Sequence, residues 1–348
     1  MKRIFSLALA VLLVCPVLFA QQGKRFQVAG VAFYNLENLF DTINNNGKYD
    51  LEFSPEGQRR WDGKKYWSKI KNMAYAIKNL KSDITPMGPA VIGVSEIENR
   101  SVLEDLVKDP QIKEYNYQIV HHDSPDRRGV DVGMLYNPRM FQVLNVTHHF
   151  LKVEGEPHFL TRDQTCVTGL LMGEKVSIIV NHWPSRSGGE KGSRHLREAA
   201  AALSKHIADS VLAVDPKQGV IVMGDLNDDP FNPSCAEVLG AVRKAKDVKE
   251  NGFYNPWWDV LDKGIGSLAY RGQWNLFDQI IISSYLVGKD RSTWKYFKCK
   301  VHNDIPGMKT TEGDRQGYPL RTYSAGIFLN GFSDHYPTQI FLTREIAQ

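Results

Sequence analysis

The stretch that decides the fold is Val220-Ile221-Val222-Met223-Gly224-Asp225-Leu226-Asn227. Its four leading apolar residues predict a buried strand. That strand ends abruptly in a carboxylate and an amide, which are groups that hold a hard cation or position a water molecule. Such groups are costly to bury unless they are paired or bind a metal ion. The stretch therefore predicts a core sheet with a polar site at the end of one strand.

The same design recurs along the chain. Apolar runs lead into polar residues at several places, or polar residues lie just before such a run: Asn35, Glu96, Asn181-His182, Asp278 and Ser333-Asp334-His335. Repeated placement of polar groups at strand ends indicates an active site rather than scattered surface charge.

Length and composition fit a single domain. The chain has 348 residues, 42% hydrophobic and 24% charged, which suits one large globular unit. No repeat, low-complexity tract or long linker divides residues 21–348. Strands are expected near residues 28–34, 91–95, 131–136, 166–171, 176–182, 220–224, 278–282, 325–329 and 338–343.

Three amphipathic helices are expected between these strands. The first is capped by Ser68 and continues to Leu80, the second covers Ser101 to Val107, and the third runs from Ser193 to about Val214. The polar face of the third helix carries Arg197, Glu198, Lys205 and Asp209. Strands and helices mixed in this way predict an α/β fold of two packed sheets with helices on the outside.

Residues 1–20 are expected to be a signal peptide. Lys2-Arg3 precede the apolar stretch from Ile4 to Ala20, and cleavage is expected before Gln21. That stretch is short for a membrane span, which needs about 20 apolar residues. We therefore expect export to the periplasm or the medium, with no stable membrane association. Loss of Lys2 and Arg3 lowers the formal net charge from +4 to +2, too small a bias to indicate a polyanionic partner. No protein partner is evident.

The remaining cysteines and one insertion carry weaker signals. Cys166, Cys235 and Cys299 are odd in number and lack Cys-x-x-Cys spacing, so they allow one disulfide and do not support a zinc site. The segment 41–67 reads as a surface insertion. Its Asn44-Asn45-Asn46-Gly47 resembles the start of a calcium loop, but Phe53 stands where a bidentate Glu belongs. A plain turn is the preferred interpretation.

Several residues have both a structural and a chemical interpretation. Glu96 is either a solvated charge or a ligand for Mg²⁺ or Mn²⁺, which prefer oxygen donors. His182 is either a satisfied strand terminus or a catalytic group, and His335 gains weight from the nearby carboxylates that could orient its ring. Arg128 and Arg271 are either exposed ion-pair residues or guanidinium groups that bind phosphate.

Taken in order, seven stretches resemble the endonuclease/exonuclease/phosphatase superfamily, the DNase I-like proteins. They extend from residue 31 to about 343 and are Asn35-Leu36-Glu37-Asn38, Ser95-Glu96-Ile97-Glu98-Asn99, Arg127-Arg128-Gly129-Val130-Asp131-Val132, Asn181-His182-Trp183-Pro184-Ser185, Gly224-Asp225-Leu226-Asn227, Phe277-Asp278-Gln279-Ile280 and Ser333-Asp334-His335-Tyr336-Pro337. The chain is most similar to secreted bacterial nuclease-type members. The resemblance implies a four-layer α/β sandwich, two packed mixed β-sheets flanked by helices.

The resemblance also implies roles for the site residues. Metal binding is implied for Asn35, Glu96 and Asp334. Catalytic roles are implied for His182, Asp225, Asn227, Asp278 and His335, and substrate contacts are assigned to Arg128, Asn181 and Arg271. The cofactor is expected to be Mg²⁺ or Mn²⁺, with Ca²⁺ as a further option.

The leading hypothesis is a metal-dependent phosphodiester hydrolase, an exported nuclease acting on DNA or RNA. The same core could instead hydrolyse a phospholipid such as sphingomyelin, or an inositol phosphate. A catalytically inactive binding module is the third hypothesis.

Overall fold

The computed structural model describes residues 24–43 and 50–346. The expected signal peptide and the Asn44–Gly47 turn lie outside the described residues. Within the described ranges, no helix combines the length and the apolar character that a membrane crossing requires.

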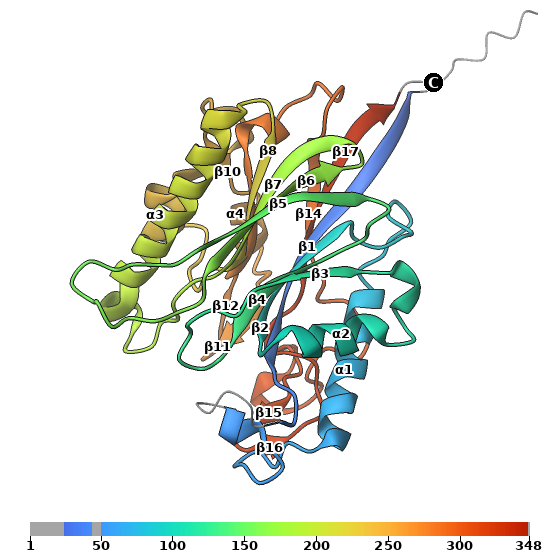
Figure 1. Cartoon of the computed structure of the whole chain (residues 1–348), viewed down its shortest axis with the longest axis vertical. Coiled ribbons are helices and arrows are strands. Elements are labelled where there is room, and N and C mark those ends of the chain that lie inside the picture. Colours follow the sequence, from blue (N-terminus) through green and yellow to red (C-terminus); the bar gives the residue numbers. More distant parts are fainter. Residues whose placement is uncertain (1–23, 44–49, 347–348) are drawn as a thin grey trace, which may run out of the picture.

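Two large sheets form the centre of the molecule (Figure 1). The first has the strand order β14-β17-β1-β2-β4-β3, with bounds β1 (Arg25–Leu39), β2 (Val91–Ile97), β3 (Gln118–His121), β4 (Asp131–Tyr136), β14 (Lys295–Val301) and β17 (Thr338–Ile346). The second has the order β5-β6-β7-β8-β13-β10-β9, with bounds β5 (Phe141–His149), β6 (Gln164–Leu171), β7 (Glu174–His182), β8 (Gly219–Asp225), β9 (Ala241–Val242), β10 (Phe253–Tyr254) and β13 (Asp278–Ser283). Two hairpins lie outside the sheets: β11 (Leu268–Tyr270) with β12 (Gln273–Asn275), and β15 (Tyr323–Ser324) with β16 (Ile327–Phe328).

Helices cover the outer face of each sheet. The apolar sides of α1 (Gly63–Lys78) and α2 (Arg100–Lys108) pack in one cluster with β1, β2 and β4. Helix α3 (Glu190–Val214) packs on the opposite flank against β7 and β8, and a short α4 (Trp258–Leu261) lies near β10 (Figure 1). The molecule is therefore a four-layer α/β sandwich, as the sequence predicted.

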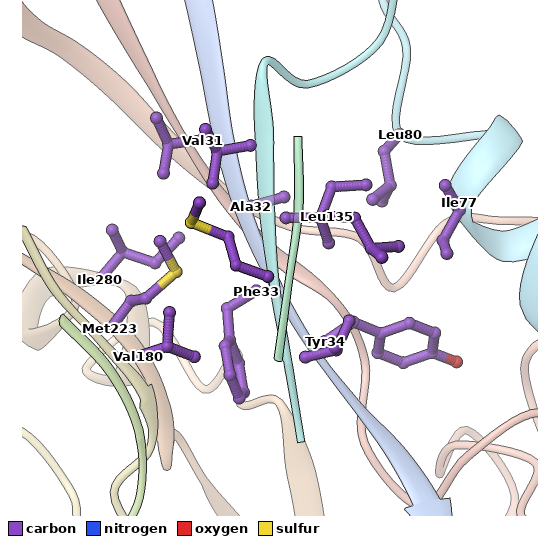
Figure 2. Packing of buried hydrophobic residues seen from close by; sticks show 14 of the residues in the cluster. Val31, Ala32, Phe33, Tyr34, Ile77, Leu80, Leu135, Val180, Met223 and Ile280 are labelled. Carbon is purple, nitrogen blue, oxygen red and sulfur yellow. The ribbon is translucent and has the colours of Figure 1, made fainter. Parts of the chain in front are cut away.

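Side chains that alternate along the strands build the core between the sheets. Val31 and Phe33 of β1 point toward Met223 and Val180 of the second sheet, while Tyr34 points the other way, toward α1 (Figure 2). Burying each large apolar side chain of this kind contributes roughly 1.5–3 kcal/mol. Because the inner face follows every second residue, the next inward positions after these apolar rows are the polar residues at the strand ends.

The sheets approach closely at Gly93 in β2. A Cβ atom added there would lie 2.6 Å from the sulfur of Met223 on the second sheet. A side chain at this position would therefore require Met223 and Phe33 to shift within the core beside the site.

Three expectations about secondary structure were wrong in part. Helix α1 begins five residues before Ser68, because Asp62 accepts a 2.9 Å hydrogen bond from the backbone N–H of Lys65 and caps it. The strand expected at 325–329 is instead the β15–β16 hairpin, whose turn residue Ala325 has a left-handed φ of 48°.

Arg197 is the third correction. The sequence placed it on the polar face of α3, yet its side chain is fully buried and its Nε lies 2.8 Å from Oδ1 of Asp228. Asp228 follows β8, so this ion pair ties α3 to the strand that carries Asp225.

The disulfide that the sequence allowed does not form, because Cys166, Cys235 and Cys299 are all free thiols.

A buried histidine links the ends of β14 and β17. Nε2 of His302 lies 2.7 Å from Oε1 of Gln339, and the His302 side chain is 3% exposed. Burial, assisted by the charge of Lys300, lowers the pKa of His302 to about 4. His302 is therefore neutral in the folded protein over most of the acidic range.

We expect this histidine to make the fold sensitive to acid. An unfolded histidine has a pKa of about 6.5, so above that pH both states are neutral. As the pH falls from 6.5 toward 4, the unfolded state binds the proton first, and the folded state loses roughly 3 kcal/mol of relative stability. In His302→Gln, the stability lost between pH 7 and pH 4.5 should be smaller by about 2 kcal/mol. Urea unfolding at both pH values measures this difference, and an unchanged loss in the variant would contradict it.

Candidate active site

Three polar side chains lie in one row across the second sheet, where β7 and β8 end and the antiparallel β13 begins. His182 of β7 is the register partner of Asp225 of β8, and Asp225 is the partner of Asp278 of β13. His182 and Asp225 lie two positions after the inward residues Val180 and Met223, and Asp278 lies two positions before the inward Ile280, so all three point toward the first sheet. The ladder of backbone hydrogen bonds therefore sets their spacing.

The polar groups of the first sheet lie where the pairing of β1, β2 and β4 becomes irregular. Asn35 and Ser95 are register partners, and the pairing shifts immediately after both. Since Gly93 faces the second sheet, simple alternation would turn Glu96 toward the helices. Instead Glu96 has a left-handed φ of 58°, and its Oε1 lies 3.8 Å from Nε2 of His182. Such a backbone costs about 1–3 kcal/mol and is typical of functional sites.

Asp225 lies at the centre of the group. Its Oδ1 accepts a hydrogen bond of 3.0 Å from the backbone N–H of Asn227, and its Oδ2 accepts one of 3.0 Å from Nδ2 of Asn35. The same Oδ2 lies 3.6 Å from Nε2 of His182 and 3.8 Å from Nε2 of His335. Burial raises the pKa of Asp225 to about 6, although the charge of His335 opposes the shift. This carboxylate can therefore accept a proton near neutral pH.

The two histidines around Asp225 differ in charge. Nδ1 of His335 lies 2.6 Å from Oδ2 of Asp278. Burial disfavours the charged ring, yet the carboxylates of Asp278 and Asp225 outweigh it and raise the pKa of His335 well above its usual value. Burial lowers the pKa of His182, and the nearby Arg162 and Arg128 lower it further. At neutral pH His335 is a cationic donor and His182 is neutral.

The segment that carries His335 is held against the end of β1. Ser333 donates a 2.7 Å hydrogen bond to the carbonyl of Asn35 and accepts one of 3.1 Å from the backbone N–H of His335. Asp334 is partly exposed beside them, with Oδ2 2.8 Å from a guanidinium nitrogen of Arg321 and Oδ1 3.9 Å from Nε2 of His335.

Three further predicted residues lie around this centre. Arg128 places NH1 3.6 Å from Oε1 of Glu96. Asn227 lies directly beyond Asp225, but its Nδ2 already donates to the carbonyl of Trp183 at 2.9 Å. Arg271 is farther out, in the turn between β11 and β12, where it lines a cavity of about 870 Å³ together with Asp334.

Asn181 does not join the site. Its side chain is completely buried, and its Nδ2 donates to the carbonyls of Ile179 and Met223 at 2.9 and 3.1 Å. Its Oδ1 accepts from Ser204 on α3. Because neighbouring residues of a strand face opposite sides, Asn181 points to α3 while His182 points to the site. The predicted substrate contact is therefore wrong in this structure, and Asn181 instead holds the end of β7.

Sequence reasoning missed a buried charge cluster beside Asp334. Glu37, with φ of 46°, accepts hydrogen bonds from Arg321 and from the backbone N–H of Thr322. Lys69 of α1 lies 3.9 Å from Glu37, and burial lowers the pKa of Lys69 and raises that of Glu37. One signal was available, because Lys69 falls four residues before Met73 on the apolar stripe of α1.

Arg162 was also missed. Its buried guanidinium donates to the carbonyls of His182 and Trp183 and forms a 3.0 Å ion pair with Asp126. It thereby fixes the end of β7 to the loop that carries Arg128. Nothing in the local sequence around residue 162 distinguishes it from a surface arginine.

The site can hold a divalent cation. One ligand atom each of Asp225, Asp278 and His335 lies within 4.8 Å of the others. However, His335 is already bonded to Asp278 and is protonated, so it is a poor ligand in this state. The carboxylates of Glu96 and Asp334 and the amide oxygen of Asn35 are the oxygen donors to which the sequence assigned a cation, and oxygen donors suit Mg²⁺ and Mn²⁺. Oε1 of Glu96 is 3.6 Å or more from Arg128 and His182, which leaves it available to a cation.

Comparison with known proteins agrees with this architecture. Truncated TDP2 of Caenorhabditis elegans matches with a TM-score of 0.53 at 17% identity, over 90% of this chain and 97% of that chain. An endonuclease/exonuclease/phosphatase family protein of Bacteroides thetaiotaomicron gives 0.54 at 12% identity, over 93% and 100%. The mannosyl-6-phosphatase Bt3783 of the same species gives 0.54 at 14% identity, over 90% and 99%. The TM-scores and the coverage indicate a shared fold, at sequence identities too low to indicate more.

Sequence comparison gives a consistent result. No curated protein matches the chain by sequence. The model of the Endonuclease/Exonuclease/phosphatase family matches residues 30–344, which is nearly the whole described part. The chain therefore belongs to the endonuclease/exonuclease/phosphatase family of phosphoester hydrolases.

Proposed function

We propose that this protein is a divalent-metal-dependent phosphodiester hydrolase that acts on nucleic acid. The observation that carries the proposal is the pair of histidines beside Asp225, of which His335 is cationic and His182 is neutral, with Glu96 facing His182. Phosphoryl transfer requires a group that accepts the proton of water and cationic groups that stabilise charge on the phosphate. The cluster supplies both.

Each residue has a distinct role in this proposal. Asp225, with its pKa of about 6, accepts the proton of the attacking water, and Asn227 helps to position that water. His335, held by Asp278, donates a hydrogen bond to a phosphate oxygen. Neutral His182 contacts the scissile group from the other side.

Asn35, Glu96 and Asp334 are the residues that would hold the cation. Mg²⁺ or Mn²⁺, or less suitably Ca²⁺, supplies charge that stabilises the phosphate and the leaving oxygen when bound. The strained backbone at Glu96 supports this assignment, because it turns the carboxylate toward the site.

The substrate is proposed to be DNA or RNA, bound through its phosphate backbone. Arg128 lies beside Glu96, and Arg271, Arg315 and Arg321 line the 870 Å³ cavity that contains Asp334. Guanidinium groups bind phosphate oxygens well, and such contacts weaken as salt rises. With the expected signal peptide, this makes an exported nuclease of the periplasm or the medium.

A small phosphoester is the second candidate substrate. The same cavity is lined by Tyr270 and Tyr318 as well as by arginines, so it could enclose an inositol phosphate or a phospholipid head group. Likeness of fold to a mannosyl-6-phosphatase supports including sugar phosphates among the compounds assayed. Hydrolysis of these compounds without cleavage of DNA or RNA would reverse the ranking.

We expect Glu96→Gln to abolish most activity on plasmid DNA and on RNA in Mg²⁺ or Mn²⁺. Loss of a cation ligand removes several kcal/mol of transition-state stabilisation, which is about 100-fold or more in kcat/KM. The matched control is Glu104→Gln on the exposed face of α2. Neither polymer being cut by the unmodified protein, or an active Glu96→Gln variant, would refute the nuclease proposal.

Asp278→Asn should lower kcat by about 100-fold and leave KM nearly unchanged. The amide keeps the size of the side chain but removes the charge that orients His335 and stabilises its protonated form. Steady-state kinetics on an oligonucleotide measure the two constants, with Asp209→Asn on α3 as the exposed control. A rise in KM at constant kcat would mean that Asp278 acts only in substrate binding.

Arg271→Gln should raise KM for DNA without lowering kcat. If Arg271 contacts one phosphate, the slope of log KM against log salt should change by about one contact, or roughly 0.9 for a duplex. Arg291→Gln is the control, because Arg291 lies over the rings of Phe26 and Phe297, away from the cavity that contains Arg271. Equal salt slopes for Arg271→Gln and the unmodified protein would exclude the phosphate contact.

A further inference from the structure

A second group of metal-ligating side chains lies where the edges of the two sheets meet, and we call it the rim cluster: His121, His122, Asp123, Asp131, His148 and Asp163. His121 ends β3, an edge strand of the first sheet, and His148 lies in β5, an edge strand of the second. The rings of His122 and His148 stack with their centroids 4.1 Å apart. None of these residues takes part in the proposed hydrolysis.

Three members have the spacing of cation ligands. Nε2 of His121 lies 3.1 Å from Oδ2 of Asp131 and 3.9 Å from Oδ1 of Asp123, and one ligand atom of each lies within 4.8 Å of the others. A cation with bonds of about 2.1 Å holds neighbouring donor atoms roughly 3–3.5 Å apart. Only Asp123 has to move, and its side chain is 86% exposed and free to do so.

The buried carboxylate of Asp163 is an independent observation that favours a cation at this place. It is 8% exposed, and its Oδ2 lies 3.4 Å from Nε2 of His122. Its Oδ1 is buried without a hydrogen-bond partner among the described residues. A buried carboxylate oxygen without a partner is costly, and burial raises the pKa of Asp163 accordingly. A cation nearby would offset that cost.

The surroundings favour entry of a cation. Asp123 and Asp131 line a surface cavity of about 630 Å³. The other charged residues of its wall are Glu98, Arg100 and Asp126, and Asp126 is already paired with Arg162 at 3.0 Å. Carboxylates still outnumber guanidinium groups around the cavity, and an excess of one sign of charge concentrates counter-ions of the other sign.

We propose that the rim cluster is a second metal site, bound through His121, Asp123 and Asp131 and selective for a borderline cation such as Zn²⁺. An imidazole beside carboxylates suits Zn²⁺, Ni²⁺ or Cu²⁺, whereas Mg²⁺ and Ca²⁺ prefer all-oxygen ligands. Two of the ligands bracket the loop 122–130, because His121 precedes it and Asp131 follows it, and Asp123 lies within it.

The site would hold the loop that carries Arg128. Ser124 already donates its backbone N–H to Oδ1 of Asp131 at 2.9 Å, which closes the base of the loop. A cation between His121, Asp123 and Asp131 adds a second closure. The site is therefore structural, and it fixes the approach of Arg128 to Glu96.

Zn²⁺ titration of the full chain tests the proposal. All proteins carry Glu96→Gln and are kept in excess Mg²⁺, so that the active site contributes equally to each. Calorimetry should show saturable Zn²⁺ binding that raises Tm. Adding His121→Gln or Asp123→Asn should weaken the binding at least tenfold. Asp123 is exposed, so its variant keeps the test valid if His121→Gln does not fold.

His195→Gln is the matched control. Nε2 of His195 lies 2.7 Å from Oε1 of Glu156 on the exposed surface, a histidine–carboxylate pair without the rest of the cluster. Its affinity for Zn²⁺ should equal that of the parent. The proposal would be overturned if His121→Gln and Asp123→Asn also bound Zn²⁺ as tightly as the parent, or if no protein showed saturable binding. His121 and Asp131 would then be a plain hydrogen-bonded pair. Neither result bears on hydrolysis, which is assayed in Mg²⁺ with intact Glu96.

Discussion

The register of β7, β8 and β13 is the constraint on which the rest of the molecule depends. The hydrogen bonds that join these strands also align His182, Asp225 and Asp278. A slip of one residue would turn every inward side chain outward. Val180, Met223 and Ile280 would then leave the core together with the catalytic groups. The stability of the core and the alignment of the catalytic groups therefore depend on the same strand register, and a change of register alters both.

Buried charges within this frame are tolerated because each has a partner. Asp278 binds His335, Asp225 accepts from Asn35 and Asn227, and Glu37 lies between Lys69 and Arg321. Breaking a buried pair by removing one partner typically costs about 3–5 kcal/mol. The surroundings also assign charge. Asp278, 2.6 Å from His335, helps to keep that ring protonated, whereas burial and the charges of Arg162 and Arg128 lower the pKa of His182 and keep it neutral. The same buried pairs therefore stabilise the core and set the charges of the site residues.

Much of this architecture could be predicted from the sequence. Apolar runs that end in polar residues identified the central strands of both sheets and the residues that meet around Asp225, but not the edge strands β3, β5 and β14. Orientation was harder to predict. Asn181 and His182 are neighbours in sequence, and only the packed sheet shows which of them faces α3. Glu96 reaches the site through an irregular backbone that no periodicity predicts.

The burial of two charged residues could not be predicted from the sequence for a related reason. Arg197 and Lys69 lie in amphipathic helices, where a charge is ordinarily assigned to water, yet both are buried against carboxylates contributed by distant segments. Ser68 looked like a cap because it precedes an apolar stripe, whereas Asp62 begins the helix one and a half turns earlier. For the two buried charges the deciding partner is remote in the chain, whereas the cap at Asp62 is local.

The buried free thiols allow the packing of α3 on the second sheet to be followed by alkylation. Cys166 lies in β6 and Cys235 lies beneath α3, both in the apolar cluster between that helix and the second sheet. Burial raises the pKa of the Cys166 thiol to about 11, so little reactive thiolate exists while the layer stays closed. Alkylation of these two sulfurs thus reports the separation of α3 from its sheet, with the half-buried Cys299 of β14 as a reference on the other sheet.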